Sequence, residues 1–132
     1  QAALDIALAH VRARRFSYLG ERLAEVNAVQ HKVAELWTQV EKTRGLIYQA
    51  ARLGDIGDPR ALTSILACKA DVAVTAVTVT NEAMTLAGGS AYRDNSQLAR
   101  LLRDARAAHV MAPTSDMLRQ WLGRALLDIP LL

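Results

Sequence analysis

The stretch of the chain between residues 86 and 127 constrains the fold most, because it sets turn residues at fixed offsets between helical patterns. A Gly-Gly pair at residues 88–89 separates two such patterns, and a Pro-Thr-Ser-Asp sequence at residues 113–116 has the composition of a helix start. Helix packing alone does not require turns and polar residues at these places. Most of the remaining chain has only the pattern of amphipathic helices, so functional inference depends mainly on this stretch.

Apolar residues recur at the spacing of an amphipathic helix along most of the chain. The predicted helices cover residues 2–18, 23–53, 59–86, 96–109 and a last segment from 114 or 115 to 127. Gly20 ends the first, and Asp58 and Pro59 stand where an N-cap and the first helical residue are expected. The run at residues 72–80 has β propensity, but its flanks and the length of the segment favour a buried helix.

Long helices joined by short glycine-containing loops are usually antiparallel neighbours, so we expect an all-α fold, an up-and-down four-helix bundle. Aromatic residues make up only 5% of the chain, which favours closely packed helices over a β-sandwich. The helical pattern is already under way at Ala2, and Gln1 is a poor cap. We therefore expect a single helical domain over residues 1–132 that is a fragment of a longer protein.

Charge and composition argue against several classes of partner. The formal net charge of +3 is mild and the arginines are scattered, so no nucleic-acid partner is expected. No apolar run approaches the roughly 18–20 residues that span a bilayer, and the start lacks the layout of a signal peptide, so no membrane partner is expected either. A single cysteine excludes an internal disulfide and makes the cytoplasm the expected location.

The sequence lacks the common catalytic arrangements. His10, His31 and His109 lie on separate helical segments without the spacing of a metal-binding helix, so no metal site is expected. Cys68, inside a predicted helix, has the setting of a small buried residue and not of a nucleophile. The Arg-Asp pair at residues 103–104 has the pattern of an ordinary solvated ion pair.

Two short motifs allow both a structural and a functional interpretation. A helix C-cap explains one glycine of the pair Gly88-Gly89, whereas the second lets a ligand or a neighbouring subunit approach the backbone. No strand precedes this pair, which excludes a dinucleotide-binding turn. Thr114 and Ser115 form either a plain N-cap or a helix start whose free N–H groups hold an anion or a polarised ring edge.

Several motifs follow one another in a characteristic order. They are Leu19-Gly20 followed by residues 23–25 and 28–35, the helix of 67–87, Gly88-Gly89-x-x-Tyr92, the run 101–105, the start at 113–115 and Gly123-Arg124-Ala125. In this order and spacing, which extends over nearly the whole chain, the sequence resembles the C-terminal helical domain of acyl-CoA dehydrogenases and their flavoprotein relatives.

The resemblance implies a domain that follows an N-terminal helical domain and a central β-domain in an FAD-dependent acyl-CoA or acyl-carrier dehydrogenase. FAD would lie between the domains and against a neighbouring subunit, in a homodimer or in a homotetramer built as a dimer of dimers. The isolated fragment would be catalytically inactive, because the substrate pocket is largely built elsewhere.

The resemblance also implies which residues contact FAD. Gly88 and Gly89 match glycines that pack on the adenylate part of the cofactor across the subunit interface. Thr85 and Asn27 match positions that are often occupied by cofactor-contacting glutamines, and Asn27 keeps an amide there. These residues are therefore expected to line the cofactor.

Further cofactor contacts are expected at Thr114, Asp116 and Arg15. Thr114 matches the hydroxyl on the flavin side, and Asp116 stands in place of a further polar contact. The family's arginine ahead of its Phe-Gly pair falls at Phe16, and Arg15 lies one residue earlier. Because one residue turns a helix side chain by about 100°, Arg15 replaces that arginine only if the helix is locally rearranged.

One departure from the family's pattern concerns the mechanism. Many members keep a catalytic glutamate two residues before the threonine, where it removes the α-proton of the thioester while FAD takes the β-hydride. Ala112 occupies that position here, so no catalytic residue is assigned. Pro113 replaces a glycine of the family and suggests a reshaped substrate pocket.

Three hypotheses are open. In the first, the protein is a dehydrogenase whose glutamate comes from the helix preceding this segment. In the second, it is a flavin-dependent monooxygenase of the same fold, which lacks the base and uses reduced flavin with oxygen. His109 lies near the segment where such enzymes often carry polar or histidine residues. In the third, it is a helical interaction module without flavin.

Overall fold

A computed structural model describes residues 1–15 and 20–131 of the chain, and it is all-α. The helices are α1 (Ala2–Ala13), α2 (Asn27–Asp55), α3 (Ala61–Ala87), α4 (Gln97–Val110) and α5 (Ser115–Leu126), with two 3₁₀ turns, η1 (Leu23–Glu25) and η2 (Gly88–Tyr92). The predicted fold class is thereby confirmed, and the valine- and threonine-rich run lies inside α3 as expected. The hydroxyl of Thr80 there donates to the carbonyl of Ala76 at 2.7 Å, which satisfies a buried polar group within the helix.

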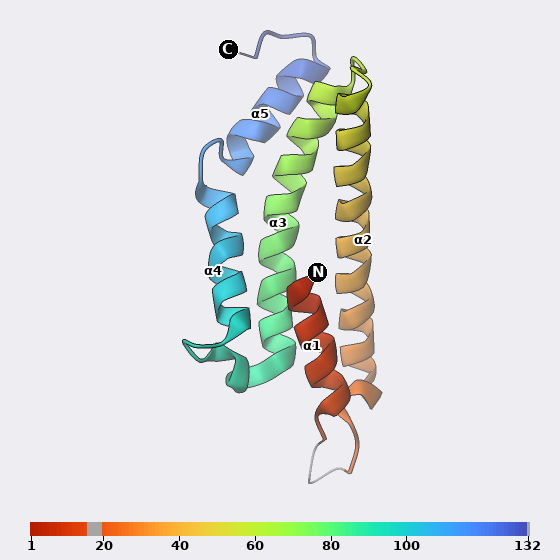
Figure 1. Ribbon diagram of the computed structural model, residues 1–132, viewed down its shortest axis with the longest axis vertical. Helices are drawn as coiled ribbons and strands as arrows, with labels where there is room; N and C mark the ends of the chain where they lie inside the picture. Colours follow the sequence, from red (N-terminus) through yellow and green to blue (C-terminus); the bar gives the residue numbers. More distant parts are fainter. Residues whose placement is uncertain (16–19, 132) are drawn as a thin grey trace.

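Helix α3 is the centre of the domain and packs against all the other α-helices (Figure 1). Helix α2 runs beside it over almost its whole length in the opposite direction, while α4 and α5 follow one another along its other side (Figure 1). Helix α1 covers only about one half of α3 (Figure 1). The five helices therefore occupy the four positions of a four-helix bundle, because α4 and α5 share one position.

The core consists of three clusters, one of which is built mainly of alanine. One cluster joins α1, α3, η2 and α4 through Ala3, Ala7, Ala83, Ala87, Ala91 and Leu98. A second joins α1, α2 and α3 through Leu4, Leu36, Val40 and Val79, and a third joins α3 to α5 through Leu66, Ala70 and Leu118. Alanine at the contacts lets helix axes approach closely, as the scarcity of aromatic residues predicts.

Three helix boundaries differ from those predicted. Helix α2 starts at Asn27 and not at residue 23, because residues 23–25 form the separate turn η1 and Val26 is extended. Helix α1 ends at Ala13, because Arg14 has extended backbone angles of φ −75° and ψ 128°. Part of the predicted extension of this helix, including Phe16, lies outside the described residues. Helix α3 starts at Ala61 after an Arg60 cap, so Asp58 is not its N-cap. The Asp58 carboxylate instead accepts a hydrogen bond from the backbone N–H of Arg60 at 2.8 Å, which closes a turn before the helix.

Hydroxyl groups cap the starts of α4 and α5, and the cap of α5 is the one that the sequence predicted. Ser96 accepts a hydrogen bond from the backbone N–H of Ala99 at 3.4 Å at the start of α4. Thr114 does the same for Met117 at 3.4 Å at the start of α5. These hydroxyl caps satisfy backbone donors that have no partner within their own helix.

The central helix is more apolar than the sequence pattern predicted. Among the described residues, the helical segment Ala61–Tyr92 is long and apolar enough, by length and composition alone, to cross a membrane. The expectation that no run approaches that length was therefore wrong for α3. A helix that lies at the centre of a bundle passes the same test, and α3 contacts each of the other α-helices.

Candidate functional site

Three of the residues predicted to contact the cofactor lie together at the end of α3. Thr85, Gly88 and Gly89 border a hollow of about 380 Å³. Gly88 has a φ of +68°, which ends α3 in a conformation that L side chains rarely adopt and that glycine tolerates. Gly88 and Gly89 are exposed at this corner and carry no side chain, so their backbone is accessible beside the hollow.

The second glycine has no structural explanation within this chain. Gly89 does not have a positive φ, and a Cβ atom built on it meets nothing within 4 Å among the described residues. Neither the backbone conformation nor the packing of this domain therefore requires glycine at this position. An added Cβ is equally free of neighbours at Gly45, Gly54 and Gly123, so open space alone does not mark Gly89 as a ligand contact.

A basic side chain borders the same hollow, but it belongs to Arg14 and not to Arg15. Arg15 is exposed and forms an isolated antiparallel bridge with Arg22, beyond the end of α1. Because the helix has already ended, the 100° rotation expected between neighbouring helical side chains does not apply to this pair. His10 and Arg14 were not predicted as cofactor contacts, although they follow Ala3 and Ala7 at the three- and four-residue steps of one helix face.

The other predicted site lies at the start of α5. The Thr114 oxygen accepts the capping bond from Met117, and its hydroxyl hydrogen is not used in that bond. Asp116 is exposed and pairs with Arg119 at 3.2 Å, three residues along the same helix. Such exposed pairs contribute little to stability, so the Asp116 carboxylate is available to other partners.

Two contacts fix the loop that leads into α5. The ammonium group of Lys69 on α3 donates to the carbonyl oxygen of Pro113 at 2.9 Å. On α4, the Nδ1 atom of His109 lies 3.3 Å from the hydroxyl oxygen of Ser115, whose residue is only 3% exposed. His109 therefore has a structural contact that holds the loop, and the loop itself is anchored to both α3 and α4.

The predicted residues thus fall into separate groups. Helix α4 has 14 residues and is about 21 Å long, and it separates the Gly88-Gly89 corner from Thr114. Asn27 is exposed at the first turn of α2, after η1, and does not border the hollow at Gly88. One small molecule cannot fill both places unless it is extended, or unless two copies of the chain supply one place each.

Ala112 occupies the position where the resemblance places a catalytic glutamate, and its methyl group cannot accept a proton. Burial raises the pKa of the Cys68 thiol, and the nearby Asp71 adds to that effect, so the reactive thiolate form is disfavoured. Within residues 1–15 and 20–131, no group of three or more His, Cys, Asp or Glu side chains is placed to hold a metal ion. The part of the chain described here offers binding groups but no evident catalytic one.

The chain resembles known proteins in both sequence and fold. Residues 1–127 match the family described as acyl-CoA dehydrogenase, C-terminal domain. The cyclohex-1-ene-1-carbonyl-CoA dehydrogenase of Geobacter metallireducens is 37% identical over 127 residues, which are 96% of this chain and 33% of that protein. The mitochondrial isovaleryl-CoA dehydrogenase of Arabidopsis thaliana is 34% identical over 128 residues, 96% of this chain and 30% of that protein.

A solved structure shows the same architecture. The butyryl-CoA dehydrogenase of Megasphaera elsdenii superposes with a TM-score of 0.88 and 29% identity, over 96% of this chain and 32% of that one. The fold is that of a helical domain from a family of flavoprotein oxidoreductases. The chain belongs to the acyl-CoA dehydrogenase family and corresponds to its C-terminal domain. It spans about a third of the length of the curated relatives it matches.

Proposed function

We propose that this chain is the C-terminal domain of an FAD-dependent acyl-CoA or acyl-carrier dehydrogenase, in which it completes the flavin site and a subunit interface. The family is FAD-dependent and its members act on acyl-CoA thioesters. The observation that carries the proposal is the hollow at the end of α3, which Thr85, Gly88 and Gly89 border together with the basic side chain of Arg14.

The residues at this corner suit the adenylate part of a dinucleotide. Gly88 and Gly89 leave room for a flat group to approach the backbone, and Thr85 presents a hydroxyl on the same hollow. Arg14 brings a positive charge to the hollow, which favours the phosphates of such a ligand. In this proposal Arg14, and not Arg15, takes the part of the family's arginine, while the predictions for Arg15 and Asn27 still await a test.

The start of α5 suits the flavin part. The helix N-terminus directs backbone N–H groups outward, and the Thr114 hydroxyl is free to donate to a ring oxygen or nitrogen. Lys69 and His109 keep this loop in place, so the donors are positioned before a ligand binds. When bound, FAD would accept the hydride from the β-carbon of the thioester. Asp116 lies one residue into α5 and offers a further polar contact.

The proton acceptor has to come from outside this chain. Ala112 cannot remove the α-proton, so a dehydrogenase of this type carries its carboxylate on a segment that precedes Gln1. The same absence supports a second candidate function, that of an oxygen-using flavin monooxygenase of this fold. Either way, we expect the isolated residues 1–132 to be inactive.

Exposed apolar side chains support an assembly of subunits. Large ones stand free on the surface of the described chain, among them Trp37, Tyr92, Leu126 and Leu127, which are 55%, 79%, 67% and 70% exposed. Side chains of this kind are enriched where protein surfaces meet. We infer a homodimer or a homotetramer, in which Gly88 and Thr114 of different subunits serve one cofactor.

The test uses the full-length protein. We expect it to purify with a flavin absorption spectrum that acyl-CoA bleaches under anaerobic conditions. A flavin spectrum that no thioester bleaches, together with oxygen consumption on a small substrate, would favour the monooxygenase. A protein that neither carries nor binds flavin would contradict both and leave a helical interaction module.

A further inference from the structure

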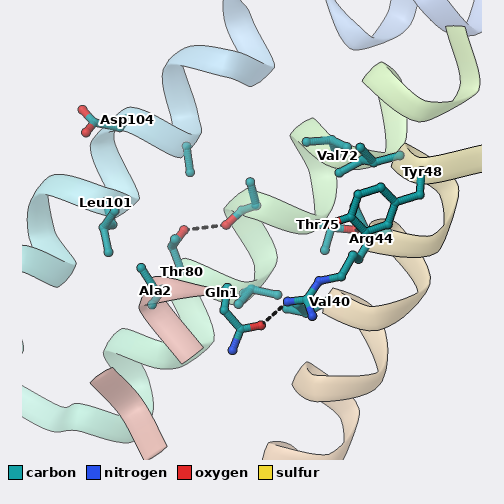
Figure 2. A pocket seen from close by; sticks show the side chains of 16 residues that line it. Gln1, Ala2, Val40, Arg44, Tyr48, Val72, Thr75, Thr80, Leu101 and Asp104 are labelled. Carbon is teal, nitrogen blue, oxygen red and sulfur yellow. Dashed lines mark hydrogen bonds between the residues drawn. The ribbon is translucent and has the colours of Figure 1, made fainter. Parts of the chain in front are cut away.

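We draw no further inference here: the strongest candidate, the groove of about 550 Å³ that α2, α3 and α4 line beside the start of α1 (Figure 2), carries nothing, because a helix in that groove restates an established property of the family's fold.

Discussion

The ammonium group of Lys69, on the central helix α3, donates a hydrogen bond to the carbonyl oxygen of Pro113 at 2.9 Å. This contact joins residues 44 positions apart in the sequence and fixes the loop from which Thr114 starts α5. Because Pro113 has no N–H of its own, its carbonyl is the only backbone hydrogen-bonding group that this residue offers. The position of Thr114 relative to α3 therefore depends on a side chain that is not itself part of the candidate site.

Lys69→Met should loosen this loop without unfolding the domain. A hydrogen bond from an exposed lysine contributes about 1 kcal/mol, so the free energy of unfolding falls by about that amount. We expect backbone amides at the start of α5 to exchange faster with deuterium, and FAD to bind less tightly to the full-length protein. Lys42→Met, at an exposed lysine of α2, is the control. Unchanged exchange at residues 114–118 would show that the contact does not position the loop.

Thr43 is a buried polar group between α2 and α3. Its hydroxyl oxygen lies 2.7 Å from an Asp71 carboxylate oxygen, to which it donates, and 3.0 Å from the Thr75 hydroxyl. Thr43→Val should reduce the free energy of unfolding by about 1 kcal/mol, since it removes the hydroxyl and keeps the volume. Thr38→Val on the same helix removes a hydroxyl that bonds only to the Ala34 carbonyl of its own helix, and it should cost less. A Thr43→Val protein as stable as the parent in urea unfolding would contradict this account.

The turn between α2 and α3 should respond to acid. Arg60 donates to Asp58 through its side chain at 2.9 and 3.0 Å and through its backbone N–H at 2.8 Å, which together lower the pKa of that carboxyl to about 2. A pKa below the unfolded value means that the stabilisation is present above about pH 4 and is lost as the pH falls towards 2.

We therefore expect carbon-detected NMR to show the Asp58 carboxyl titrating with a midpoint near 2. Asp58→Asn should lower the melting temperature at neutral pH and make no difference once the carboxylate of the parent is protonated. Asp55→Asn, at the end of α2, serves as the comparison. A midpoint close to that of a free aspartate would show that the Arg60 contacts do not hold in solution.

The sequence was sufficient for the elements whose residues keep one period. The apolar spacing predicted α2, α3, α4 and α5 to within a few residues, and the hydroxyl cap at Thr114 predicted where α5 starts. The burial of a central helix outweighed the β propensity of its valines and threonines, as the length of the segment indicated.

The candidate site was harder to predict because it depends on where helices end. Arg14 and Arg15 are adjacent in sequence, and only the early end of α1 decides that Arg14 borders the hollow beside Gly88. Likewise, Asp58 is a residue type that often caps helices, but its hydrogen bond to the Arg60 backbone closes a turn that ends before α3 begins. The Lys69–Pro113 contact joins two segments that are distant in the sequence, and the residue pattern of neither segment predicts it.

The two glycines at the end of α3 should respond differently to the same added methyl group. Gly88→Ala forces an L residue into a φ of +68°, so we expect the free energy of unfolding to fall by about 1–2 kcal/mol. Gly89→Ala meets no atom within 4 Å among the described residues and does not have a positive φ, so it should leave stability nearly unchanged. Urea unfolding of both variants checks this difference, and an equal loss in both would contradict it.

The affinity of the full-length Gly89→Ala protein for FAD tests the central claim most directly. A methyl group added to a well-packed contact costs about 1–3 kcal/mol, which corresponds to a Kd raised by about 5- to 150-fold. The account predicts this loss of FAD affinity, measured by calorimetry on the apoprotein, at an unchanged free energy of unfolding. An unchanged Kd for FAD would contradict it, because the Gly88-Gly89 corner would then not face the cofactor.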